Sequence, residues 1–259
     1  MDTMKKYGDY LDKDNRIYTF AHPVRWGKRS RGFSLVELLT VISVIIILAA
    51  ILMPLVGNAI NDAKKLRALK NLQQIATAYV SFSLKDRARE LHNCKNAAEW
   101  AGVLSKHEEL NTASIFIFND DYLVESNHRA MPKTIGIRKK GQWSINPDFE
   151  HFPLSVIIIS GIASRAPAAT TPVAYTRGLD YETGKWRPAK GDNGGIYGES
   201  GGIIVFLDGH AEFYSNLTDE ANMLVNYYTG EKTSKISEAV NGGARALSWT
   251  GVEWEAKQK

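Results

Sequence analysis

Glu37 is the residue whose position most needs a chemical explanation, because its carboxylate lies at the start of a long uncharged stretch. The 19 residues from Leu38 to Val56 contain no Asp, Glu, Lys or Arg. Basic residues precede the acid, at Arg25, Lys28, Arg29 and Arg31. Placing an acid in an apolar helix costs a few kcal/mol, up to about 3 at the bilayer centre. The position of Glu37 therefore predicts a function and a partner for its charge.

The uncharged stretch has the length of a membrane helix. A straight helix of 19 residues rises about 28 Å, close to the hydrocarbon thickness of a bilayer. A cleaved secretory signal fits less well, because no small-x-small site closes the apolar run and the run is too long. Basic residues also follow the span, at Lys64, Lys65, Arg67 and Lys70, so charge alone does not fix its orientation.

A basic leader is followed by the run Gly32-Phe33-Ser34-Leu35-Val36-Glu37. This run resembles the prepilin leader of type IV pilins and type II secretion pseudopilins. In that family a basic leader ends in Gly, and Phe, Ser or Thr, Leu, an aliphatic residue and Glu follow. Here Gly32, Phe33, Ser34, Leu35, Val36 and Glu37 match without a gap. Pro54 falls where the family often bends its helix. The resemblance covers roughly residues 25–90.

This resemblance implies a processing reaction and an assembly contact. A membrane aspartic peptidase, the prepilin peptidase, would cut between Gly32 and Phe33, and the new Phe33 amine would be methylated. Glu37 would pair with the Phe33 amine of a neighbouring subunit, which would relieve the cost of its buried charge. The remaining alternative from the residues alone is an ordinary signal anchor with a chance acid.

The same resemblance implies a location and partners. The chain would span the bacterial inner membrane once, with a cytoplasmic N-terminus and a periplasmic C-terminal domain, and then enter a pseudopilus filament. Its partners would be the prepilin peptidase, other pilin or pseudopilin subunits, an inner-membrane assembly platform and membrane lipid. The motor ATPase must be another protein, because the glycine-rich stretch lacks the Gly-Lys-Ser/Thr ending of a phosphate loop.

One serine matches a hydrolase pattern. Ser200 lies in Gly-Glu-Ser-Gly-Gly, which satisfies the G-x-S-x-G of nucleophile elbows. That elbow needs a strand before the serine and a helix after it, whereas a glycine-rich loop precedes Ser200 and a predicted strand follows it. His151 is the one central histidine upstream that a triad would use. We therefore expect no catalysis by this chain.

Metal sites have weak support in the sequence. The single cysteine, Cys94, excludes a Cys-rich site, and the histidines are scattered. Two C-terminal segments, Thr171–Arg177 and Gly201–His210, resemble type II secretion G-like pseudopilins, whose major members bind calcium in a C-terminal loop. The candidate oxygen donors for calcium are Asp192, Asn193, Glu199, Asp208 and Asp219. They have no EF-hand order, so we expect solvated turn residues and no cofactor.

The net charge of +4 lies entirely in the leader. Residues 1–32 hold eight of the 32 basic and four of the 28 acidic residues, so 24 of each remain after Phe33 is exposed. A neutral mature chain gives no general nucleic-acid footprint, and no nucleic-acid partner is expected. Residues 1–24 mix charged and polar residues without a period and are predicted to be a disordered cytoplasmic extension.

After Gly57 the membrane helix is predicted to continue as an amphipathic helix. Apolar residues recur at three- and four-residue steps and predict one face that packs on a soluble domain. That face comprises Ile60, Ala63, Leu66, Leu69, Leu72, Ala76, Tyr79 and Phe82. Pro54 removes a backbone donor, so we expect a bend there. The predicted divisions are 1–32 (leader), 33–57 (membrane and filament-core helix), 58–90 (amphipathic continuation) and 91–259 (globular domain).

The first part of the globular domain has few strong signals. A shorter helix is predicted from about Ala97 to Leu110. Ser114 to Phe118 predicts a strand that ends in a turn at residues 119–121. The segment from His128 to Pro153 is predicted to be mostly loop.

The C-terminal half is predicted to be strand-rich. Strands are expected at Val156–Ile159 and Pro172–Arg177, and Gly191–Gly202 is predicted to be a surface loop. Asp208-Gly209 between apolar runs predicts a hairpin of Ile203–Leu207 and His210–Tyr214, because both turn residues tolerate positive φ. A helix is expected from Thr218 to about Tyr228, followed by an exposed tail.

Together these features predict an α+β protein with a long kinked N-terminal helix and a small antiparallel sheet. Its predicted function is that of a pseudopilin in a type II secretion-like system. The alternatives are a type IV pilin for adhesion, motility or DNA uptake, a membrane-anchored protein that binds carbohydrates or surfaces, and the serine hydrolase weighed above.

Overall fold

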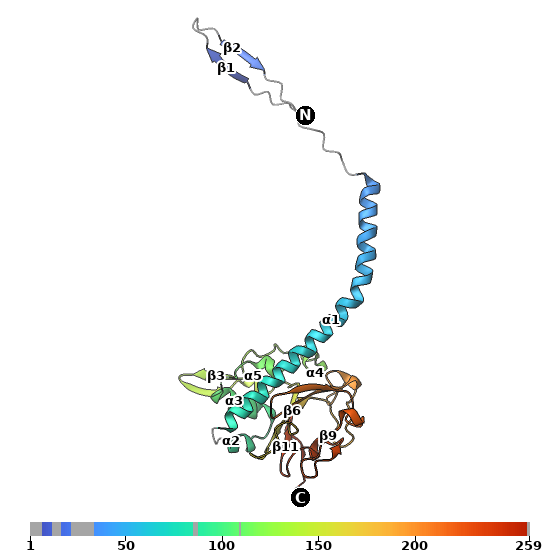
Figure 1. Cartoon of the computed structure of the whole chain (residues 1–259). Coiled ribbons are helices and arrows are strands. Elements are labelled where there is room, and N and C mark those ends of the chain that lie inside the picture. Colours follow the sequence, from blue (N-terminus) through green and yellow to red (C-terminus); the bar gives the residue numbers. More distant parts are fainter. Residues whose placement is uncertain (1–6, 12–16, 22–33, 85–87, 109, 258–259) are drawn as a thin grey trace. The chain divides into compact units, whose positions relative to one another are not determined.

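The computed structural model describes residues 7–11, 17–21, 34–84, 88–108 and 110–257. The chain divides into two compact units, with the boundary between Val56 and Gly57. The first unit contains a strand pair and the start of helix α1. The second contains the rest of α1 and all later elements (Figure 1). The fold is α+β, as the sequence predicts.

Two described segments within residues 1–24 form a pair of strands where the sequence predicted disorder. Strand β1 (Tyr7–Leu11) pairs antiparallel with β2 (Ile17–Ala21), with Tyr7 opposite Ala21 and Leu11 opposite Ile17. The segment Ile-Tyr-Thr-Phe in β2 has high strand propensity. This strand propensity was not recognised in the sequence because charged residues surround the segment.

Helix α1 runs without interruption from Leu35 to Ser83 and passes through Pro54. A bend at Pro54 stays a prediction. The helix ends before the predicted limit at residue 90, and a short helix, α2 (Ala88–His92), follows.

Only the later part of the predicted amphipathic face enters the core of the second unit. The buried residues on α1 are Ala68, Leu72, Ile75, Ala76, Ala78, Tyr79 and Phe82. Ile60, Ala63 and Leu66, which the sequence placed on the same face, are exposed. The packed face therefore begins near Ala68, about two turns later than predicted.

Helix α3 (Ala97–His107) packs beside this part of α1. Its first turn is capped by Asn96, whose side-chain oxygen accepts a hydrogen bond of 2.8 Å from the Glu99 N–H. The Trp100 ring stacks on Tyr79 with 6.0 Å between centroids, and both residues are buried. This helix confirms the prediction for residues 97–110, apart from its last turn.

An antiparallel sheet of six strands forms the centre of the second unit. Its order is β12-β11-β5-β6-β7-β8. These strands are β5 (Val156–Ser160), β6 (Pro172–Thr176), β7 (Gly202–Phe206), β8 (Ala211–Tyr214), β11 (Arg245–Leu247) and β12 (Val252–Glu255). Every residue of β5, β6 and β7 is buried, which explains their near-continuous apolar sequence.

The Asp208-Gly209 hairpin is confirmed between β7 and β8. Gly209 has a φ of +89°, and the Phe206 N–H and His210 carbonyl close the turn at 2.9 Å. Asp208 fixes the turn further, because its Oδ1 accepts the His210 N–H at 3.0 Å. The strand limits agree with the sequence within two residues.

The predicted strand from Ser114 to Phe118 is wrong. Residues Ala113–Ile115 form the 3-10 helix η1, and the chain then continues without a strand partner in the described residues. The Asn71 side chain donates to the Ser114 carbonyl at 2.9 Å, and the Ser155 hydroxyl accepts the Phe118 N–H at 2.9 Å. Side chains thus satisfy backbone groups that a sheet would otherwise pair.

The segment predicted as loop between residues 128 and 153 contains a hairpin and a short helix. Strand β3 (Gly136–Lys139) pairs with β4 (Gln142–Ile145), and helix α5 (Pro147–Glu150) follows. The turn residues Lys140 and Gly141 have φ values of +50° and +82°. Such a turn suits a two-residue hairpin, but Lys-Gly is a weaker sequence signal than Asn-Gly or Asp-Gly.

The predicted helix from Thr218 to Tyr228 is reduced to one 3-10 turn, η3 (Glu220–Asn222). Strand β9 (Leu224–Val225) follows and pairs with β10 (Lys232–Thr233). The Asn226 side chain accepts the N–H groups of Tyr228 and Thr229 at 3.0 and 3.1 Å. An asparagine bonded to its own following backbone favours a turn over a helix.

The expected exposed tail is instead part of the sheet. Strand β11 lies between β5 and β12, and Ala246 and Leu247 are fully buried. A short 3-10 helix, η4 (Ile236–Glu238), precedes it. The last strand is the edge of the sheet, where Trp254 is buried.

The glycine-rich stretch 191–202 is only partly a surface loop. Gly194, Gly195, Ile196 and Gly198 are buried. Arg177, itself buried, donates to the carbonyls of Asp192 and Gly194 and forms an ion pair with buried Asp121. Because that charge pair is desolvated, removal of either partner would leave an uncompensated charge. This arginine anchors the loop against α4 (Tyr122–Glu125).

Candidate processing and assembly site

Glu37 caps the start of α1 together with Ser34. The Ser34 N–H donates to Glu37 Oε2 at 2.8 Å, and the Glu37 N–H donates to Ser34 Oγ at 3.2 Å. This reciprocal pair is a capping box, which satisfies two of the backbone donors that a helix start leaves open. The acid therefore has a structural role within one chain.

This capping role was not predicted from the sequence, although its signal was present. Ser34-x-x-Glu37 before an apolar run is the sequence signature of a capping box. The contact occupies one acceptor position of the carboxylate, which offers about four. The remaining positions are compatible with a bond to a second donor, such as an amine from another chain.

The first part of α1 is apolar and unpacked. Residues Leu35–Met53 have a mean hydropathy of 2.9 and none is buried within the described structure. By length and composition this segment is the one candidate membrane span among the described residues. Glu37 is its one ionisable side chain and lies in the first turn. An apolar helix and a prepilin-type motif together fit a single-pass, membrane-anchored protein.

The structure places only part of the predicted processing site. Gly32 and Phe33 lie outside the described residues, so cleavage between them and methylation of Phe33 stay predictions. Pro54 lies within α1, and its proposed part in assembly is likewise a prediction.

Ser200 does not have the surroundings of a nucleophile elbow. It is the exposed last residue of the 3-10 helix η2 (Gly198–Ser200), and β7 follows it. Ser200 and His151 line two different hollows of the second unit. The strand-then-helix arrangement of hydrolases is therefore missing around this serine in the described fold.

The calcium candidates occupy several parts of the second unit. Glu199 precedes β7 and Asp208 follows it, so the whole strand of five residues, about 16 Å long, lies between them. The Asp208 Oδ1 lies 2.5 Å from the His210 ring. Burial disfavours the charge of Asp208, but its bonds to the backbone and ring of His210 outweigh burial and lower its pKa.

The other calcium candidates also lie apart from that turn. Asp192 and Asn193 line a hollow with Arg177, whereas Asp219 Oδ2 accepts a bond of 3.3 Å from Ser215. Among the described residues no group of three or more His, Cys, Asp or Glu side chains is arranged to hold a metal ion. Calcium binding has no further structural support.

Comparison with known proteins identifies the N-terminal segment. Residues 27–53 match the family described as the prokaryotic N-terminal methylation motif. No curated protein and no solved structure matches the chain. The matched residues include the whole predicted processing site, the Ser34–Glu37 cap and the membrane span. The chain therefore carries a prepilin-type motif, which supports a type IV pilin-like or pseudopilin subunit.

Proposed function

We propose that this chain is a pseudopilin that is processed before Phe33 and polymerises into a periplasmic pseudopilus for protein secretion. The observation that supports this proposal is the prepilin-type motif at residues 27–53, joined to an apolar helix that no other described residue covers. Exposed apolar surface of this extent requires lipid or other helices around it.

In this proposal the Glu37 carboxylate serves two successive purposes. In a single chain it caps α1 through Ser34. In the filament it also accepts a hydrogen bond from the methylated Phe33 amine of a neighbouring subunit. The positive charge of that amine compensates the negative charge of Glu37 in apolar surroundings. The partners are the prepilin peptidase, further subunits and an inner-membrane platform, with the N-terminus cytoplasmic and the second unit periplasmic.

Three variants of the full chain separate the cap from the ion pair. Glu37→Gln keeps a capping residue but removes the charge, Glu37→Val removes both, and Ser34→Ala removes half of the cap and keeps the charge. We expect normal cleavage in all three, assembly only in Ser34→Ala, and loss of filaments in both Glu37 variants. The measurement is cross-linking of subunits in the membranes of cells that contain the native assembly machinery. Normal filaments with Glu37→Gln would contradict the ion pair.

A deletion strain distinguishes a pseudopilin from a type IV pilin. A pseudopilin deletion should leave a specific set of proteins in the periplasm, and complementation by the wild-type chain should restore their secretion. Unchanged secretion together with loss of surface motility, adhesion or DNA uptake would assign the chain to type IV pili instead.

A further inference from the structure

A hollow of about 400 Å³ lies beside β12, at one edge of the six-stranded sheet. Four segments form its walls: the loop after β6, the β9–β10 connection, η4 and its neighbours, and β12. Its volume is within the range of small-molecule pockets, about 300–1,000 Å³. Neither the processing site nor the proposed assembly contact uses it.

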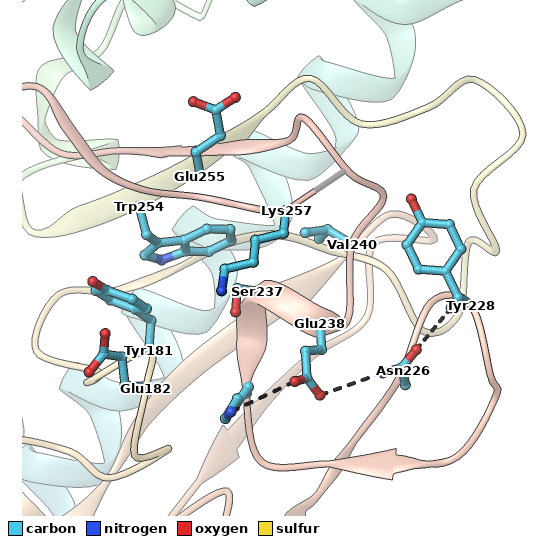
Figure 2. A pocket seen from close by; sticks show the side chains of 11 residues that line it. Tyr181, Glu182, Asn226, Tyr228, Ser237, Glu238, Val240, Trp254, Glu255 and Lys257 are labelled. Atoms are coloured by element: carbon cyan, nitrogen blue, oxygen red, sulfur yellow. Dashed lines mark hydrogen bonds and ion pairs between the residues drawn. The ribbon is translucent and has the colours of Figure 1, made fainter. Parts of the chain in front are cut away.

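Aromatic rings form two of the walls. Tyr181 and Trp254 lie together with 6.2 Å between ring centroids, and Tyr228 stands on the opposite side (Figure 2). The Trp254 indole is held by its N–H, which donates to the Tyr175 hydroxyl at 3.0 Å. The Tyr228 hydroxyl accepts the Gly242 N–H at 2.7 Å. Hydrogen bonds therefore hold the Trp254 and Tyr228 rings in place before any ligand arrives.

Oriented polar groups lie between these aromatic walls. Glu238 accepts a bond of 2.7 Å from the Thr233 hydroxyl, and its other oxygen lies 3.8 Å from Lys235 Nζ. Asn226 lies beside it, with its amide nitrogen 3.5 Å from Glu238 (Figure 2). A carboxylate has about four acceptor positions, so the Glu238 carboxylate keeps capacity for further donors.

Aromatic faces beside planar polar groups suit a ligand that is apolar on one face and rich in hydroxyls at its rim. A sugar ring has this chemistry, because its C–H groups contact the electron-rich face of an aromatic ring while its hydroxyls bind carboxylate and amide groups. The hollow has three acids, Glu182, Glu238 and Glu255, and two lysines, Lys235 and Lys257. The excess of acid disfavours uronate, sulfate and phosphate groups.

We propose that this hollow binds a short segment of a neutral glycan. The proposal is independent of polymerisation, since a chain that is cleaved and assembled normally could still fail to bind sugar. In this proposal the second unit binds a ligand in addition to forming the core that buries the C-terminal part of α1.

Calorimetric titration of the full chain in lipid nanodiscs tests the proposal. The medium must be free of sugar-headgroup detergents, which would compete. The probes are neutral oligosaccharides of glucose, N-acetylglucosamine, mannose or galactose, with oligogalacturonate as the anionic comparison. We expect saturable binding of at least one neutral probe with a Kd of about 1 mM or tighter.

Variants at the aromatic wall locate the binding. Tyr181→Leu keeps apolar bulk but removes the ring and should weaken binding about tenfold, whereas Tyr181→Phe should stay within about twofold. The matched control is Tyr122→Leu, an exposed tyrosine on α4 outside the hollow, which should bind as the wild type does. If Tyr181→Leu lowers the Tm, Tyr228→Leu on the half-exposed opposite wall replaces it and should show the same loss.

Three results would overturn the proposal. They are the absence of binding by every neutral probe at about 10 mM, equal or tighter binding of oligogalacturonate, and unchanged affinity in a folded Tyr181→Leu or Tyr228→Leu variant.

Discussion

The two ends of helix α1 have the same secondary structure and opposite surroundings. At the N-terminal end, Leu35–Met53 is predominantly apolar and is exposed. At the C-terminal end, Leu72, Ile75 and Phe82 are fully buried in the core of the second unit. A helix needs only local hydrogen bonds to form, but an apolar surface needs a partner. The core of the second unit covers the apolar surface of the C-terminal end. The apolar surface of the N-terminal end needs lipid or another helix to cover it.

The similarity to a known family is confined to the N-terminal part of the chain, which includes the exposed end of α1. The matched segment, residues 27–53, ends where the span ends. In the proposed function, processing and helix packing in a membrane would constrain residue type position by position, since the cleavage site, the cap and the acid would each have to be present. The sheet of the second unit needs only apolar residues of suitable size, so many different sequences satisfy it.

The largest expected effect is on the buried end of α1. Leu72→Ala removes side-chain volume from a fully buried site and should lower the free energy of unfolding of the second unit by about 2–5 kcal/mol. Leu66→Ala is the matched control, because Leu66 is 65% exposed and should change it by less than about 0.5 kcal/mol. Chemical denaturation of the full chain measures both. Equal losses would show that the packed face begins before Ala68.

A charge in the exposed end should affect insertion and leave the second unit intact. Ile46→Lys places an ammonium near the middle of the span, at a cost of about 3 kcal/mol for insertion. The chain should then be extracted from membranes by alkaline carbonate, while the Tm of the second unit is unchanged. Ile60→Lys, beyond the span, is the control and should remain in the membrane. Retention of Ile46→Lys would argue against Leu35–Met53 as the anchor.

A smaller loss of stability is expected when acid protonates Asp180, which lies on the loop that carries Tyr181. Burial opposes ionisation of Asp180, but the N–H groups of Thr183 and Glu182 and the Arg187 guanidinium outweigh it, and they lower its pKa to about 2. A lowered folded-state pKa stabilises the fold above the ordinary value of 3.8, and this contribution is lost as the pH falls from about 4 to about 2.

Urea midpoints across that pH range test this contribution. The difference in midpoint between wild type and Asp180→Asn should be constant above about pH 5 and shrink as the pH falls toward about 2. A difference that grows on acidification would contradict the sign of the shift.

The smallest effect is expected from calcium. The five candidate donors are distributed over three segments, namely the glycine-rich stretch, the β7–β8 turn and the chain after β8, so removing calcium with a chelator should leave the Tm of the full chain unchanged. A rise in Tm on adding calcium, abolished by Asp192→Asn but not by Asp208→Asn, would instead place a site in the glycine-rich loop.

The sequence predicted the parts of this protein that depend on local chemistry. The span, α3, β5, β6 and the Asp208-Gly209 hairpin follow from composition, capping and turn residues. The β3–β4 hairpin was missed because Lys140-Gly141 is a weak turn signal. The short strand β11 acquires its place only by pairing with β5, which lies far away in the sequence, and β12 then pairs with β11.

For the candidate site, the sequence identified Glu37 but assigned it only an intermolecular partner. Its bond to Ser34 follows from the same residues and shows that the acid already has a use in the single chain. The sequence left carbohydrate binding open as an alternative function but did not predict the hollow proposed to bind a glycan, because the segments that form its walls meet only in the folded chain.

The intact mass of the mature chain tests the central claim most directly. The full chain is expressed with its native peptidase, purified from membranes and measured by mass spectrometry together with N-terminal sequencing. We expect loss of residues 1–32, a chain that begins at Phe33, and the added mass of one methyl group on its amine. A mature chain that retains residues 1–32, or begins elsewhere, would contradict the account.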